Sequence, residues 1–218
     1  DVYKRQSGDE AMQQAFLSGQ DFHTLTAAKV FHVAPEEVTS RMRSSAKAVN
    51  FGIVYGISAF SLAQDIGVSV AEAKEYMERY FDTYRGVKRY MEQVVETARE
   101  KGYVETLMHR RRALPELKSS NFNMRSFGER VALNMPIQGT AADIMKLAMV
   151  RVEQRLQAEG LAAKLIMQVH DELIVECPEG ERETVQRLLE EEMSGVVRLS
   201  VPLPAQAHSG KTWLEAKG

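Results

Sequence analysis

Apolar residues recur at helical spacing along most of the first 100 residues. The stretches with this pattern are 10–19, 21–33, 39–55, 71–84 and 87–102. Ser7 and Ser69 are each followed three residues later by a Glu, which is the signature of a helix capping box. Gly19 and Gly56 are placed to end helices, and Gly86 is placed to separate two of them. The pattern therefore predicts a first part that is nearly all α-helical.

The second half of the chain mixes strand patterns with helix patterns. Runs of β-formers that meet at turn residues predict antiparallel hairpins there. The expected elements are a hairpin over 103–117, a long helix from about Asn121 that is interrupted by Pro136, a hairpin over 165–177, a helix over 181–193 and a strand beginning near Val197. The fold class expected is α+β, with a helical subdomain followed by antiparallel strands and helices, and a boundary near residue 120.

Composition narrows the class of protein. A chain of 218 residues can form one large domain or two small ones. No apolar run approaches a membrane span and the polar start, DVYKRQ, does not resemble a signal peptide, so we expect a soluble intracellular protein. The net charge of −2 does not indicate a protein that binds nucleic acid. The charge is unevenly spread, however, because residues 101–130 hold seven Lys or Arg against three acids. This local excess could hold phosphates.

Four residues of the stretch RSSAKAVNFGIVYG are spaced four apart: Arg43, Lys47, Phe51 and Tyr55. Steps of four drift slowly around a helix, so the two cations and two aromatics form one stripe. The stripe suits a nucleoside triphosphate, with phosphates at the cations and a base at the aromatics. The alternative is a solvated basic end followed by an aromatic end that faces the core.

A second polar stripe lies on the long helix. Arg130, Asn134 and Gln138 repeat the four-residue step, and Pro136 is expected to kink the helix between the last two. All three side chains donate hydrogen bonds, and every base pair offers acceptors in the minor groove. The stripe therefore suits contacts to a duplex without regard to sequence, although a surface polar face would have the same pattern.

The stretch LIMQVHDELIVEC places His170, Asp171 and Glu172 at the bend of a hairpin. Turns favour Asp, which alone accounts for many such residues. Neighbouring strand side chains point to opposite faces, so Asp171 and Glu172 cannot easily chelate one ion together. A metal here needs a second carboxylate from elsewhere. A His-Asp pair also occurs in the metal sites of phosphohydrolases, which is an alternative enzyme class. Those sites need further ligands, and the other histidines of this chain show no pair at metal-ligand spacing on one helix.

Together these motifs resemble the family A DNA polymerases. The likeness rests on RSSAKAVNFGIVYG, RVALNMPIQGTAADI and QVHDEL, with DFHTLTA, TLMHRRRALPEL and the terminal GKTW in family order, and it runs from about Ser7 to the end. It implies the C-terminal part of a polymerase: helical fingers over 7–120, then the end of the palm over 121–218. It also implies a bacterial, cytoplasmic, monomeric protein that acts in DNA replication and repair.

The resemblance implies a role for each matched residue. Arg43, Lys47 and His23 would hold the incoming deoxynucleoside triphosphate, and Lys47 would donate a proton to the departing pyrophosphate. Phe51 would pack on the nucleotide, and Tyr55 would mark the position of the template base. The primer-template DNA would be contacted by Tyr55, Arg130, Asn134, Gln138 and His170. Asp171 would bind one of two Mg²⁺ ions, with Glu172 as a catalytic neighbour.

One part of the family pattern is missing. The family carries a second metal-binding Asp on a strand just before the position of Ser7, and residues 1–6 do not match that strand. We expect residues 1–6 to be a non-native leader, and the thumb to be absent. The chain alone is therefore expected to be inactive, and the alternative function is a non-catalytic fragment that binds nucleotide or duplex DNA.

Overall fold

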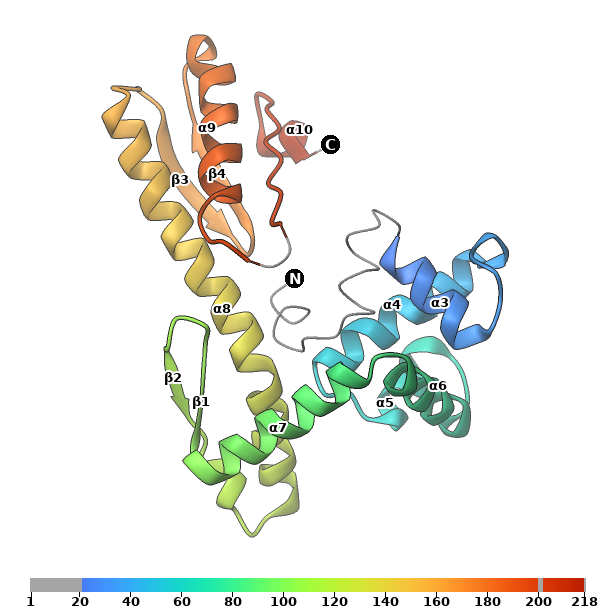
Figure 1. Cartoon of the computed structure of the whole chain (residues 1–218). Helices are drawn as coiled ribbons and strands as arrows, with labels where there is room; N and C mark the ends of the chain where they lie inside the picture. The colour runs from blue at the N-terminus through green and yellow to red at the C-terminus, as the bar shows by residue number, and fades with distance from the viewer. Residues whose placement is uncertain (1–20, 200–201, 218) are drawn as a thin grey trace. The chain divides into compact units, whose positions relative to one another are not determined.

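The computed structural model describes residues 21–199 and 202–217 (Figure 1). Contacts divide the chain into two compact units, Asp1–Gly139 and Thr140–Gly218. This boundary falls inside a helix, whereas the sequence suggested a boundary near residue 120, before that helix. The leader 1–6, the capping box at Ser7 and the helix expected at 10–19 lie outside the described residues. The assignment of the two parts to fingers and palm remains a prediction.

The first unit contains a group of helices. They are α3 (Phe22–Phe31), the 3₁₀ turn Pro35–Glu37, α4 (Ser40–Val54), α5 (Ala59–Ile66), α6 (Val70–Thr83) and α7 (Arg85–Lys101). Four of them begin at a side-chain cap: Asp21, Thr39, Ser58 and Ser69 each accept the backbone N–H three residues on. Ser69 and Glu72 form the predicted capping box. The helices expected from the sequence are therefore confirmed for the described residues.

One hydrophobic core holds α4, α5, α6 and α7 together. Its largest members are Ile53, Leu62, Tyr80 and Tyr84, each at most 1% exposed. Burial of aromatic and branched aliphatic side chains supplies most of the favourable free energy of such a core. The core fixes one face of α4 and so leaves the opposite face of that helix available to solvent.

Two local expectations were wrong. The sequence analysis missed α5, which is only eight residues long and too short for a clear periodic signal. Gly86 does not separate two helices, because it lies inside α7. The break falls at Tyr84, whose backbone leaves the helical region at φ −116° and ψ 67°. Tyr84 is fully buried, so packing rather than glycine freedom sets this corner.

The hairpin expected near 103–117 is confirmed. Strand β1 (Tyr103–Glu105) pairs antiparallel with β2 (Arg111–Ala113), and the 3₁₀ turn Pro115–Lys118 follows. Val104, Leu114 and Leu117 join Ala98 of α7 in a second small core. The arginine-rich strand β2 is exposed throughout.

Helix α8 (Phe122–Ala158) runs across the boundary between the units without a break. The interruption expected at Pro136 is absent, because this residue lies inside a continuous helix. Neither α8 nor any other helix in the described part of the chain is long and apolar enough to cross a membrane.

The second unit contains the end of α8 and an antiparallel hairpin. Its further elements are β3 (Lys164–Val169), β4 (Glu172–Glu176), the 3₁₀ turn Glu179–Glu181, α9 (Arg182–Ser194) and α10 (Trp213–Lys217). The hairpin pairs Val169 with Glu172, and a bulge at Ile166 shifts its register. The strand expected near Val197 is not formed by the described residues 197–199 and 202–212. Helices with two small antiparallel sheets confirm the α+β class.

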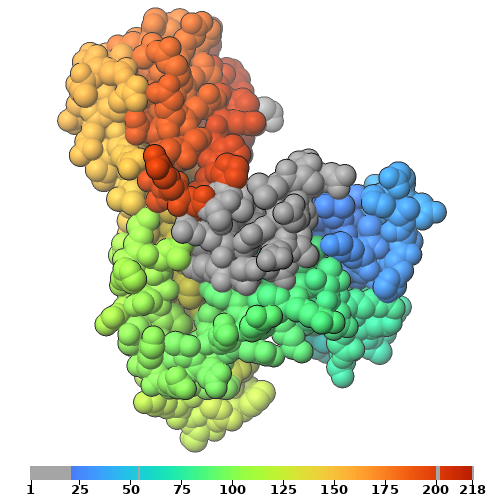
Figure 2. Space-filling view, in the orientation of Figure 1, coloured from blue at the N-terminus to red at the C-terminus, as the bar shows by residue number. Residues whose placement is uncertain are grey.

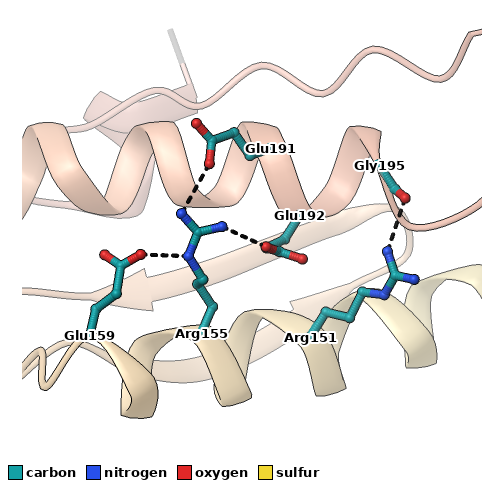
Figure 3. A network of polar contacts seen from close by, with 6 residues as sticks. All are labelled: Arg151, Arg155, Glu159, Glu191, Glu192 and Gly195. Carbon is teal, nitrogen blue, oxygen red and sulfur yellow. Dashed lines mark hydrogen bonds and ion pairs between the residues drawn. The ribbon is translucent and has the colours of Figure 1, made fainter.

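Helices α8 and α9 are joined by apolar packing and by a polar network. The core of this unit includes Val152, Leu156, Val185 and Leu188. In the space-filling view the atoms of the unit as a whole make one continuous block (Figure 2). On the surface, the guanidinium of Arg155 contacts three carboxylates, those of Glu159, Glu191 and Glu192 (Figure 3). Arg151 also donates to the carbonyl of Gly195 at 2.9 Å (Figure 3). These contacts hold the pKa of Arg155 above its ordinary value, chiefly through its hydrogen bond to Glu159.

Candidate active site

The outer face of α4 carries the stripe of cations and aromatics. Ala46, Val49 and Ile53 face the core and are at most 1% exposed. Arg43 and Lys47 are exposed, and Phe51 and Tyr55 keep 48% and 43% of their surface accessible. The alternative interpretation, in which the aromatic end faces the core, is therefore wrong. Two large aromatic side chains and two cations therefore lie exposed on the same face of α4.

His23 of α3 lies beside the aromatic part of this stripe. Its ring centroid is 5.8 Å from that of Phe51, and its Nδ1 is 3.0 Å from Nδ2 of Asn50. If the Asn50 amide donates to Nδ1, the ring proton lies on Nε2, which can then donate to an anion. Asn50 is only 5% exposed, and the sequence analysis did not single it out. The available signal in the sequence was an amide side chain directly before Phe51, within the stretch that carries the stripe.

Arg43 forms an ion pair with Asp21, the residue that caps α3. Its Nε donates to Oδ2 of Asp21 at 2.6 Å, and its Nη2 donates to Oδ1 at 3.3 Å. Hydrogen bonding from Arg43, followed by that from the Thr24 side chain, holds the pKa of Asp21 far below its usual range. Sequence analysis missed Asp21, because a capping Asp has an adequate local explanation.

Lys47 differs from Arg43 in its surroundings. It lies one turn further along α4, is exposed, and has no side-chain partner within residues 21–199 and 202–217. An ammonium group without a partner can reorient freely and can turn its N–H donors toward an anion. The stripe thus offers one fixed cation and one mobile cation.

The C-terminal end of α4 borders a cavity of about 530 Å³ within the first unit. Phe51 and Tyr55 line it from α4, Ser61 and Asp65 from α5, and Arg130 from α8. This volume lies in the usual range for small-ligand sites. The chain turns at Gly56, whose φ of +69° few side chains would tolerate, and so brings α5 against the cavity.

The polar stripe on α8 lies in the first unit, and its three members have different surroundings. Arg130 is exposed and donates to Oγ of Ser126 at 3.0 Å. Asn134 donates from Nδ2 to the backbone carbonyl of Tyr55 at 3.4 Å, while its Oδ1 is buried without a partner. Gln138 is exposed and makes no side-chain hydrogen bond in the described part of the chain. Among the described residues, Asn134 is the one member of this stripe with a hydrogen bond to a residue of the α4 stripe.

The predicted metal ligand lies in the second unit. His170 and Asp171 form the two-residue turn between β3 and β4, and both are exposed. His170 has a φ of +52°, unusual for a residue with a side chain. Gln168 donates to the His170 carbonyl at 2.7 Å, which supports the turn. Glu172 pairs with Lys217 at 3.4 Å, so its carboxylate already has a cationic partner.

A complete metal site is not formed by these residues. Within residues 21–199 and 202–217, no group of three or more His, Cys, Asp or Glu side chains could hold a metal ion. Asp171 can supply one oxygen ligand of the kind Mg²⁺ prefers. The donor set present thus fits part of a Mg²⁺ site, and the remaining ligands must come from substrate or from other parts of the protein.

Comparison with known proteins identifies the family. A family model described as DNA polymerase family A matches residues 3–215, so the chain belongs to that family. It is 54% identical over 209 residues to DNA polymerase I of Bacillus caldotenax and 53% identical over 211 residues to DNA polymerase I of Bacillus subtilis (strain 168). These alignments cover 96% and 97% of this chain, which spans about a quarter, 24%, of the length of each relative.

A solved structure has the same fold. The polymerase domain of Pol1 from M. smegmatis, in complex with DNA primer-template and dNTP, superposes with a TM-score of 0.94 at 43% identity. The match covers 100% of this chain and 38% of that one. Membership of family A confirms the resemblance drawn from the sequence motifs.

Proposed function

We propose that this chain is the nucleotide-binding and metal-binding part of an enzyme that adds deoxynucleotides to a DNA primer under the direction of a template. The observation that carries the proposal is the outward-facing stripe on α4, where Arg43 and Lys47 precede Phe51 and Tyr55. Exposed cations beside exposed aromatics match the phosphates and base of a dNTP. Family membership supports the same substrate.

The residues of the first unit bind and orient the triphosphate. Arg43 offers a planar set of N–H donors to phosphate oxygens, and His23 adds a donor. Lys47, as a mobile ammonium, donates the proton that the departing pyrophosphate takes up. Phe51 packs on the nucleotide. Tyr55 lines the cavity at the C-terminal end of α4 and marks the position of the template base.

The primer-template DNA is contacted by donors on α8 and at the hairpin turn. Arg130, Asn134 and Gln138 approach acceptors that all four base pairs share in the minor groove. His170 contacts the primer-template beside the metal-binding Asp171, with Glu172 as the neighbouring carboxylate. Such contacts hold a duplex in place without selecting its sequence.

Asp171 would hold Mg²⁺, of which the complete enzyme uses two ions. When bound, Mg²⁺ favours ionisation of the primer 3′-hydroxyl and neutralises charge on the leaving phosphates. The residues of this chain position Asp171 by the tight turn between β3 and β4. The second carboxylate would come from a strand outside the described residues.

A second candidate function is duplex or nucleotide binding without catalysis. The absence of a three-ligand metal group among residues 21–199 and 202–217 favours it for the chain taken alone. The two functions are separated by supplying single dNTPs to a full-length polymerase in which residues 7–218 follow the family's own upstream segment, including its metal-binding Asp strand. Extension opposite only the complementary template base supports the enzyme. Binding of primer-template without extension supports the second function.

A further inference from the structure

We propose that Asp21 is a positioning residue, which holds the guanidinium of Arg43 by its Nε edge and leaves the outer N–H groups of Arg43 available for phosphate oxygens. The inference rests on the proposed function, because it assumes that Arg43 binds the triphosphate. Asp21 itself does not touch the nucleotide; it acts through Arg43.

The carboxylate of Asp21 is held by its own helix as well as by Arg43. Its Oδ2 accepts from the backbone N of Thr24 at 3.1 Å and from Oγ1 of Thr24 at 2.5 Å, as part of the α3 cap. The same oxygen accepts from Nε of Arg43 at 2.6 Å. A carboxylate with several donors on one oxygen has little freedom to rotate. Arg43 is thus attached to the end of a helix and not to a mobile surface side chain.

The pairing leaves a defined set of donors on Arg43. A guanidinium has five N–H groups, and Asp21 takes the one on Nε and one on Nη2. The remaining three lie on Nη1 and Nη2, and 49% of the Arg43 side-chain surface is accessible to solvent. Within the described residues Arg43 has no other partner. Its outer edge can therefore approach an anion while its Nε edge stays bound to Asp21.

The position of Arg43 on α4 is a second ground for the pairing with the Asp21 carboxylate. Arg43 lies at the start of the helix, where the dipole disfavours cations, and no acidic residue occupies the first turn. Asp21 comes from another helix and supplies the missing negative charge. Without it, a long side chain with a large rotamer entropy would have to be ordered by the nucleotide itself.

A carboxylate beside a triphosphate is a like charge, and this repulsion opposes dNTP binding. Repulsion between exposed charges is weakened by water and salt, while ordering a long side chain costs binding free energy each time the ligand binds. Asp21 is therefore expected to improve dNTP binding. A carboxylate that merely competed with phosphate for Arg43 would weaken it, so the sign of the effect separates the two roles.

The test replaces Asp21 by Ser in a full-length family A polymerase in which residues 7–218 follow the family's own upstream segment, including its metal-binding Asp strand. Ser retains helix capping but removes the bidentate carboxylate. Equilibrium binding of dATP opposite a template thymine is measured on a primer that ends in a dideoxynucleotide, and steady-state kinetics are measured on an extendable primer. We expect Kd and KM for dATP to rise about three- to tenfold, as for loss of order in one long side chain, with kcat and primer-template affinity little changed.

Three further variants make the result specific. Asp21→Asn keeps one acceptor oxygen and should give an intermediate Kd. In an Arg43→Ala background, Asp21→Ser should have no further effect, because its partner is gone. Glu75→Gln removes the partner of Arg79 in another exposed ion pair and should leave dATP binding unchanged.

Unchanged or tighter dATP binding by Asp21→Ser, when Arg43→Ala binds weakly, overturns the inference and leaves the proposed function intact. A full effect of Asp21→Ser in the Arg43→Ala background also overturns it. If Arg43→Ala itself binds dATP as well as the unchanged protein, the proposed role of Arg43 fails and the inference fails with it.

Discussion

Asn134 of α8 donates a hydrogen bond to the backbone carbonyl of Tyr55, at the C-terminal end of α4. The bond joins residues 79 positions apart and connects the proposed DNA-binding stripe to the proposed template-base position. One of the two Asn134 amide protons is therefore used inside the protein, whereas the Gln138 side chain makes no hydrogen bond within the described residues. The two residues have the same place in the sequence pattern but different places in the structure.

This difference predicts different consequences of substitution. In the full-length polymerase, Gln138→Ala should weaken primer-template binding alone, whereas Asn134→Ala should also raise KM for dNTP, because Tyr55 loses a support. Each loss of one hydrogen bond is expected to be about 1 kcal/mol, or roughly fivefold. Duplex binding is measured by fluorescence anisotropy and KM by primer extension. Identical profiles for the two variants would contradict the assignment.

Substitution of Arg130, Asn134 or Gln138 by Ala should reduce primer-template affinity by an amount that depends little on the base pairs at the primer end. Minor-groove acceptors are shared by all base pairs, so donors there do not read sequence. Binding is compared on primer-templates that differ only in the terminal pairs. A loss confined to G·C or A·T ends would count against these contacts.

Lys47→Ala should reduce the maximal rate of nucleotide incorporation by about 100-fold or more, the usual range for a proton donor. Primer-template affinity should stay nearly unchanged, because Lys47 serves the triphosphate. Single-turnover kinetics give the rate, and anisotropy gives the affinity. Lys74, an exposed lysine on α6 that pairs with Glu78, provides the control variant Lys74→Ala. An equal loss of duplex binding in the Lys47 variant would show that this residue has another role.

Residues 1–218 by themselves should give no detectable primer extension with Mg²⁺ and dNTPs. Asp171 alone offers one carboxylate, and Mg²⁺ held by so few protein ligands binds weakly. In the full-length polymerase, Asp171→Ala should abolish extension while primer-template binding persists, because the exposed turn contributes little to the core. Robust extension by residues 1–218 would falsify the need for a second carboxylate.

Cys177 should react slowly with iodoacetamide at about pH 8, where an ordinary thiol is partly ionised. Burial, followed by the negative charges of Glu181 and Glu179, raises the pKa of this thiol. A raised pKa means less thiolate at a given pH, so the rate should keep rising at pH values where a free cysteine has levelled off. Mass spectrometry of the Cys177 peptide measures the rate, with urea-unfolded protein as the reference. Equal rates in both states would refute the shift.

Much of the local structure is determined by the sequence alone. The capping box of Ser69 and Glu72, the helical periodicity of α4 and the two hairpins depend on residues close together in the chain, so a linear pattern is enough to predict them. The same holds for the four-residue spacing of Arg43, Lys47, Phe51 and Tyr55. Periodicity places these side chains on one stripe, but it cannot say whether that stripe faces solvent or a core.

Only the tertiary structure decided that question and chose the partners of the stripe. The core formed with α5, α6 and α7 takes Val49 and Ile53 and thereby turns Phe51 outward. Packing of α3 against α4 brings Asp21 to Arg43 across 22 positions and His23 to Asn50 across 27. Such pairs depend on how helices cross, which is set by the shape of the whole core and not by any short stretch of sequence.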